Sequence, residues 1–310
     1  MFSGKGGVGK TTLVANLGAS LANDFHKNVV IFDSNLHSSH LGLHFGLYED
    51  LPVTLREVLK KRTPIMQAVY IHPATGVRIV PAPLDGEGLD LTVEKCRGLL
   101  GKVRDNYDVV ILDCAPGLGK EVLVPMQAVD EAIVISTPDI AAVTDAMKTI
   151  EILKKFKKNV IGLVINRYTN QKYELTPQEI SSTTNYSIIR TIPEDSKIPD
   201  SVSKGSPVVI SYPNSSVSRA FKQLAAFLIN EPYKEVSVWE RFRELFNFNK
   251  SSTLTGEVKP VADHQILRKE VPRKEVSDLV EIKEDLIEDV KEELKREIMR
   301  KVKERLKVRI

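Results

Sequence analysis

A glycine-rich segment near the start of the chain limits the fold more than any other feature. Residues 4–11 read GKGGVGKT and fit the pattern G-x-x-x-x-G-K-[ST]. Glycines at these positions allow backbone N–H groups to curl around phosphate oxygens, and a following helix adds the positive end of its dipole. We therefore expect a phosphate-binding loop that leads into a helix from Thr11. Lys10 should reach the β- and γ-phosphates of a nucleotide, and the Thr11 hydroxyl should bind Mg²⁺.

Short apolar segments recur through the first 230 residues of the chain. They are residues 29–32, 77–80, 109–112, 132–135, 160–165 and 188–192. These segments are nearly continuous in Val and Ile, which is typical of strands buried on both faces of a parallel sheet. Helical patterns such as 11–23 and 141–156 lie between them. The sequence predicts an α/β fold, a doubly wound and mostly parallel sheet of a P-loop NTPase domain with a C-terminal helical extension.

The strand that should lead into the phosphate loop is short in this sequence. Such a loop needs a buried strand in front of it, and only residues 1–3 precede Gly4. We expect the given start to be internal to the native protein, with about six to eight apolar residues upstream. The alternative is a variant of the fold with a shortened first strand.

A second lysine makes the loop distinctive. Residues 5–12, KGGVGKTT, resemble the deviant Walker A loop of the MinD/ParA family of ATPases. The resemblance implies ATP and Mg²⁺ as cofactors. It also implies that Lys5 reaches across an ATP-dependent homodimer to the partner's nucleotide. The residues expected around the nucleotide are Gly4, Lys5, Gly6, Gly7, Val8, Gly9, Lys10, Thr11 and Thr12.

Further matches to this family extend through residue 230, and they are closest to its MinD-type members. Residues 29–33 end in Asp33 at the switch I position, and residues 109–113 end in Asp113 at the Walker B position. Asp113 is expected to hold Mg²⁺ through water, because this hard cation prefers oxygen ligands and keeps several waters. The residues that the resemblance places around the adenine are Asn166, Arg167, Pro193, Glu194 and Asp195.

Two positions depart from the family pattern. Switch I usually carries a second acid, which positions the attacking water, and this chain has Asn35 there. Asparagine cannot act as a general base, but phosphoryl transfer depends mainly on positioning and electrostatics. We therefore predict slow hydrolysis with Lys5, Lys10, Asp33 and Asn35 as the candidate catalytic residues. In switch II, Gly119 fills a position where MinD members carry an acid, so we expect a different activating partner.

Histidines and cysteines give weaker signals. His37, His40 and His44 have a spacing that could place them on one helical face, as metal ligands would be. We interpret them instead as the polar surface of the switch. Cys96 and Cys114 lack the spacing of a disulfide framework, a CxxC motif or an iron–sulfur site.

Charge density separates a tail from the first domain, residues 1–230. Residues 231–310 hold 37 of the 85 charged residues. Within them, residues 231–248 are a candidate amphipathic helix for an inner membrane surface, with an alternative in which its apolar face packs on the protein's own core. The residues of that face are Trp239, Phe242, Leu245 and Phe246.

The remainder of the tail reads as a linker and a charged helix. Residues 249–275 lack a helical period. Residues 276–310 predict a long helix with net charge −6 over 276–294 and +6 over 295–310. This pattern favours antiparallel association or a partner-binding rod, and a solvated single helix is the alternative.

These features favour a MinD-like ATPase that couples its nucleotide state to binding of a membrane or a partner, in division-site or cell-component positioning. We expect a cytoplasmic protein, peripheral on the cytoplasmic membrane face, with an unidentified activating or cargo protein. One alternative is a ParA-like DNA-partitioning ATPase. Nucleic acid is the less favoured partner, because residues 1–230 have a net charge of only +2. Another alternative is a slowly hydrolysing regulatory or scaffold module of a motility or other apparatus.

Overall fold

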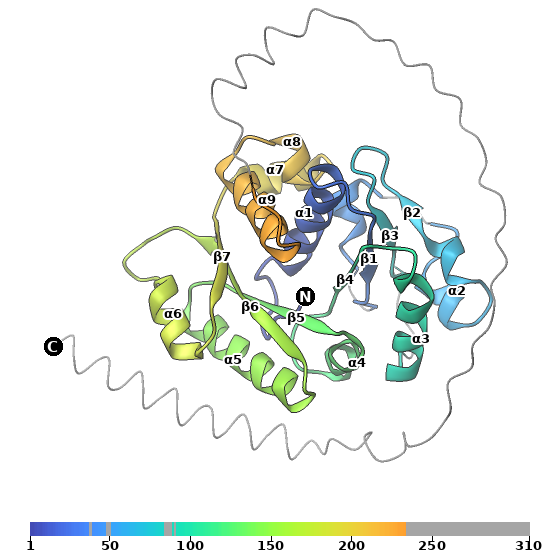
Figure 1. Cartoon of the computed structure of the whole chain (residues 1–310), viewed down its shortest axis with the longest axis horizontal. Coiled ribbons are helices and arrows are strands. Elements are labelled where there is room, and N and C mark those ends of the chain that lie inside the picture. The colour runs from blue at the N-terminus through green and yellow to red at the C-terminus, as the bar shows by residue number, and fades with distance from the viewer. Residues whose placement is uncertain (37–38, 48–50, 84–88, 90, 234–310) are drawn as a thin grey trace, which may run out of the picture. The chain divides into compact units, whose positions relative to one another are not determined.

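The computed structural model describes residues 1–36, 39–47, 51–83, 89 and 91–233 (Figure 1). The chain divides into one compact unit, Met1–Tyr233, and a second unit, Lys234–Ile310. From residue 234 onward, the predicted amphipathic helix, linker and long charged helix lie outside the described residues. Those segments, and the boundary at residue 230, stay predictions.

Two neighbouring sheets form the centre of the first unit. The first sheet has the strand order β2 (Tyr70–Ile71), β3 (Arg78–Val80), β1 (Val29–Asp33) and β4 (Val109–Asp113). The second has the order β5 (Glu131–Ser136), β6 (Asn159–Tyr168) and β7 (Ile188–Pro193). All neighbouring strands are parallel except β2, which pairs antiparallel with β3.

Residues 1–3 lie between these two sheets. The Phe2 N–H donates to the carbonyl oxygen of Ile133 at 3.0 Å, and the Ile135 N–H donates to the Phe2 oxygen at 2.9 Å. On the other side, the Met1 nitrogen lies 2.9 Å from the Leu112 oxygen of β4. Residues 1–3 therefore occupy the strand position that leads into the phosphate loop. The expectation of further apolar residues upstream stays a prediction.

Helices cover both faces of the sheets (Figure 1). One face packs against α1 (Lys10–Asn23), α7 (Lys197–Ser203), α8 (Val208–Ser211), α9 (Ser216–Leu228) and the 3-10 helix η1 (Gly42–Phe45). The other packs against α2 (Leu55–Leu59), α3 (Val93–Arg104), α4 (Lys120–Ala128), α5 (Ile140–Lys155), α6 (Pro177–Thr184) and the 3-10 helix η2 (Ile65–Ala68). Strand side chains alternate between these two cores.

The α/β fold with a doubly wound, mostly parallel sheet is confirmed. Each of the six predicted apolar segments contributes to a strand, and the predicted helices 11–23 and 141–156 agree with α1 and α5 to within one residue at each end. The edge strand β2 was not predicted, because a strand of only two residues is too short to show a periodic pattern. Among the described residues, no helix combines the length and apolar composition needed to cross a membrane.

The start of the phosphate loop passes very close to α5. A Cβ atom added at Gly4 would lie 2.4 Å from the backbone oxygen of Asp145. At Gly6 the nearest atom to an added Cβ would be Pro116 Cγ at 3.9 Å, an ordinary contact distance. Gly4 is therefore required by packing against a helix backbone, which cannot move as a flexible side chain can.

We predict that Gly4→Ala lowers the free energy of unfolding by about 1–3 kcal/mol, the usual cost of overpacking a well-packed region. Gly6→Ala is the matched control and should change it by less than about 0.5 kcal/mol. Urea unfolding of the nucleotide-free proteins measures both values. Equal effects of the two substitutions would contradict the packing explanation.

Candidate nucleotide site

The phosphate loop joins the central strand position to helix α1. Gly7 and Gly9 have positive φ angles of 77° and 90°, a backbone region that glycine enters without steric cost. Helix α1 begins at Lys10, and the Leu13 N–H donates to the Gly9 oxygen at 2.9 Å. The loop thus presents backbone N–H groups at a helix start, as an anion site needs. Thr11 and Thr12 follow in the first turn of that helix.

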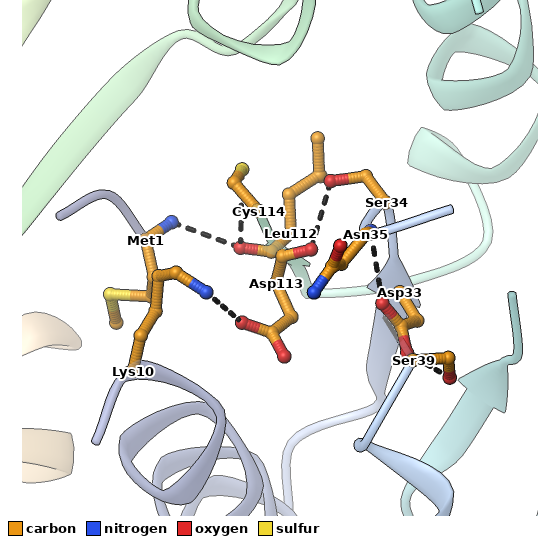
Figure 2. A network of polar contacts seen from close by, with 9 residues as sticks. All are labelled: Met1, Lys10, Asp33, Ser34, Asn35, Ser39, Leu112, Asp113 and Cys114. Carbon is orange, nitrogen blue, oxygen red and sulfur yellow. Dashed lines mark hydrogen bonds and ion pairs between the residues drawn. The ribbon is translucent and has the colours of Figure 1, made fainter. Parts of the chain in front are cut away.

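Lys10 is buried and forms an ion pair with the acid at the end of β4. Its Nζ lies 3.1 Å from Asp113 Oδ1, and the side chains of Lys10 and Asp113 are only 6% and 2% exposed. Asp33 ends the neighbouring strand β1 and is in register with Asp113. The predicted switch I and Walker B acids therefore lie side by side, next to the phosphate loop (Figure 2).

Asp33 has an unusual environment. Burial and the nearby charge of Asp113 raise the pKa of the Asp33 carboxyl to about 7. Hydrogen bonds from the Ser39 hydroxyl and the Asn35 backbone N–H favour the charged carboxylate, so they lower this pKa. Two neighbouring acids with only one paired lysine leave negative charge that a divalent cation can balance.

The predicted adenine residues gather at the ends of β6 and β7. The Asn166 Nδ2 donates to the Val8 oxygen of the phosphate loop at 2.7 Å. The Asn166 Oδ1 is buried without a hydrogen-bond partner, so it is available to accept a hydrogen bond from an amine such as that of adenine. Arg167 Nε lies 3.7 Å from Glu194 Oε2 in an ion pair. The Glu194 backbone N–H donates to the Tyr168 carbonyl oxygen at 3.2 Å.

The last two residues of this group occupy the segment from β7 to α7. Pro193 is the final residue of β7. The Asp195 carboxylate accepts a hydrogen bond from the Lys197 N–H at 2.9 Å, at the start of α7. Together with the unpartnered Asn166 oxygen, the curled loop and the two acids, this arrangement fits a nucleotide bound with a divalent cation. The individual roles of these residues stay predictions.

Lys5 differs from Lys10 in its surroundings. Its Nζ lies 3.3 Å from Asp139 Oδ1, and the side chains of Lys5 and Asp139 are 45% and 48% exposed. Asp139 also caps α5, because its carboxylate accepts a hydrogen bond from the Ala142 N–H at 2.9 Å. The second lysine of the loop is thus directed to the first turn of α5, away from the buried Lys10–Asp113 pair.

Some residues of the site were missed by the sequence interpretation. Asp139 follows the end of β5 as a helix N-cap, and that signal could have identified it. Ser34 and Ser39 had no such signal. Ser34 donates to the Asp113 carbonyl oxygen through both its N–H and its hydroxyl, each at 2.9 Å.

The interpretation of the histidines as a polar surface is wrong for His44. This residue lies in η1 with 7% of its surface exposed, and burial lowers its pKa to about 4. The reason is that η1 packs against α1 and α7. His40 is exposed, His37 lies outside the described residues, and no cluster of potential metal ligands occurs in the described part of the chain.

Comparison with known proteins identifies the family. A family model described as ParA, NUBPL iron-transfer P-loop NTPase, matches residues 1–229. The ATP-binding protein MJ0547 of Methanocaldococcus jannaschii is 37% identical over 233 residues, covering 75% of this chain and 87% of that protein. The septum site-determining protein MinD of Synechocystis is 32% identical over 228 residues, covering 72% and 85%.

A solved structure agrees with these sequence relatives. The MinD protein of Pyrococcus horikoshii, complexed with Mg-ADP, superposes with a TM-score of 0.69 at 30% identity and covers 73% of this chain and 93% of its own. Residues 1–229, which the family model matches, contain the phosphate loop, both strand-end acids and the segments after β6 and β7. The chain therefore belongs to the ParA family of P-loop NTPases, and its first domain is a MinD-like ATPase domain.

Proposed function

We propose that this protein binds ATP with Mg²⁺ and uses ATP-dependent dimerisation as a switch. In the proposed complex, residues 4–12 surround the phosphates, and Thr11 and Asp113 hold Mg²⁺. The residues at the ends of β6 and β7 hold the adenine. Bound ATP with Mg²⁺ supplies the phosphoryl group that is transferred to water. The buried Lys10, the unpartnered oxygen of Asn166 and the relative solved with Mg-ADP support this assignment.

The exposed position of Lys5 is the observation that carries the dimer proposal. Lys10 is already buried in the phosphate loop of its own chain, whereas Lys5 is half exposed beside Asp139. An exposed ion pair is worth at most about 1 kcal/mol. Lys5 can therefore leave Asp139 at little cost and reach the nucleotide of a second copy of the chain.

We predict that Lys5→Ala abolishes ATP-dependent dimerisation while ATP binding is retained. The substitution removes the charge that would reach the partner and leaves the Lys10–Asp113 pair in place. Light scattering after size-exclusion chromatography, with ATP, with ADP and without nucleotide, measures the mass. Of the three conditions, only ATP should double the mass of the wild type.

Lys172→Ala removes another exposed lysine and serves as the matched control. It should dimerise with ATP as the wild type does. A doubled mass for Lys5→Ala in ATP would reject the role of Lys5, and a wild-type protein that stays monomeric in all three conditions would reject the switch.

Hydrolysis is expected to be slow because Asn35 replaces the second switch I acid. The Asn35 backbone N–H donates to Asp33 at 3.0 Å, so residue 35 lies directly beside the acid pair. Slow turnover would give a long-lived ATP state. It also supports the second candidate function, a regulatory module that signals by its bound nucleotide more than by turnover.

We predict that Asn35→Asp raises the ATPase rate by about ten-fold or more, because a positioned general base contributes at least that much in other enzymes. Phosphate release at saturating ATP measures the rate. Asn106→Asp, an exposed position after α3, is the control and should leave the rate unchanged. An unchanged or lower rate for Asn35→Asp would count against the proposal.

The proposed switch acts at a surface through the tail. Residues 231–248 combine an apolar face with charge, and two copies in a dimer would bind a membrane with added avidity. The positioning role and the location on the cytoplasmic membrane face rest on this sequence pattern and on the MinD relatives. An activating or cargo protein would complete the cycle.

We predict that the wild-type protein sediments with anionic lipid vesicles in ATP and much less in ADP. Trp239→Glu should remove the binding in ATP, because it places a charge on the apolar face. Its dimerisation with ATP should persist, which separates a membrane defect from a nucleotide defect. Equal sedimentation of both proteins in both nucleotides would reject nucleotide-gated membrane attachment.

A further inference from the structure

Asp33 is an acid whose described hydrogen-bond donors are neutral. It is fully buried, and the single buried lysine of the phosphate loop pairs with Asp113 instead. The Asp33 carboxylate accepts a hydrogen bond from the Asn35 N–H at 3.0 Å and another from the Ser39 hydroxyl at 2.6 Å (Figure 2). Each carboxylate oxygen thus has one of these two donors, which together fix the orientation of the carboxylate plane.

Both donors come from the segment that directly follows β1. Ser34, at its start, is bound to the Asp113 carbonyl oxygen through its N–H and its hydroxyl. Ser39 is bound to Asp33 through its side chain. The start of the segment is therefore attached to β4, and Ser39 returns to the end of β1. A shift of Ser39 must either move the Asp33 carboxylate or leave one of its oxygens without this donor.

Leaving that oxygen without a donor is costly at this site. Water cannot readily replace the serine hydroxyl, because Asp33 is not exposed. Hydrogen bonds to charged groups stabilise more than neutral ones, and a buried acceptor that loses its donor carries the full desolvation cost. The Ser39 hydroxyl therefore affects where the acid beside the predicted Mg²⁺ ligand Asp113 is held.

We propose that Ser39 is a positioning residue of the nucleotide site. Its hydroxyl orients the Asp33 carboxylate and couples the position of that acid to the switch I segment. This inference rests on the proposed binding of a nucleotide with Mg²⁺. It concerns a residue outside the sequence motifs, and it needs neither dimerisation nor membrane binding.

Binding of a fluorescent ADP analogue to the full chain, once with Mg²⁺ and once with EDTA, tests this role. Ser39→Ala should weaken binding about ten-fold in Mg²⁺, the effect of one hydrogen bond to a charged group. Binding in EDTA should change by less than about two-fold, within the range of a neutral surface substitution. Ser39→Thr keeps a hydroxyl and should restore the Mg²⁺-dependent affinity. Ser203→Ala, an exposed serine of α7, is the matched control.

A double-mutant cycle separates positioning from a general loss of structure. In an Asp33→Asn background, Ser39→Ala should have little further effect on binding in Mg²⁺, because the two residues act through one contact. Additive effects would overturn the proposal. An equal loss of binding in Mg²⁺ and EDTA, or no loss in Ser39→Ala, would also overturn it. Failure of the wild type to dimerise would reject the proposed dimerisation switch but not the role of Ser39, because the assay measures binding of the ADP analogue to a single chain.

Discussion

The buried ion pair between Lys10 and Asp113 is the contact on which the rest of the site depends. Taking either charge out of water alone costs several kcal/mol, so the phosphate loop and the end of β4 are held together. The pair also determines the surroundings of the second acid. Because Lys10 pairs with Asp113, the Asp33 carboxylate instead accepts hydrogen bonds from the Asn35 N–H and the Ser39 hydroxyl, which are neutral donors. One ion pair thereby links the phosphate loop, both strand-end acids and switch I.

The two lysines of the phosphate loop differ in burial, and this difference suits them to different roles. Lys10 is enclosed with a carboxylate, so its position is fixed within its own chain. Lys5 is half exposed and has a weak surface contact with the first turn of α5. The two residues are both lysines, and they lie five positions apart in the sequence. Their different burial, more than their charge, suits one to binding within the chain and the other to contact outside it.

The sequence predicted the features that depend on local patterns. Continuous apolar segments identified the strands, and the glycine spacing identified the loop with Lys10. Contacts across the fold were harder to predict. The hydrogen bond from Ser39 to Asp33 follows no periodic pattern of the sequence, and the ion pair of Lys5 and Asp139 joins residues 134 positions apart. His44 was misjudged because its spacing gave no sign that η1 packs against α1 and α7.

The position of residues 1–3 has a mechanical consequence. These residues pair with β5 on one side and contact β4 on the other, and they continue directly into the phosphate loop. A displacement of that loop would therefore be transmitted as shear between the two sheets. The amide proton of Ile135, which is bonded to the Phe2 oxygen, lies at this joint. Its rate of exchange with solvent would report how firmly the two sheets are held together.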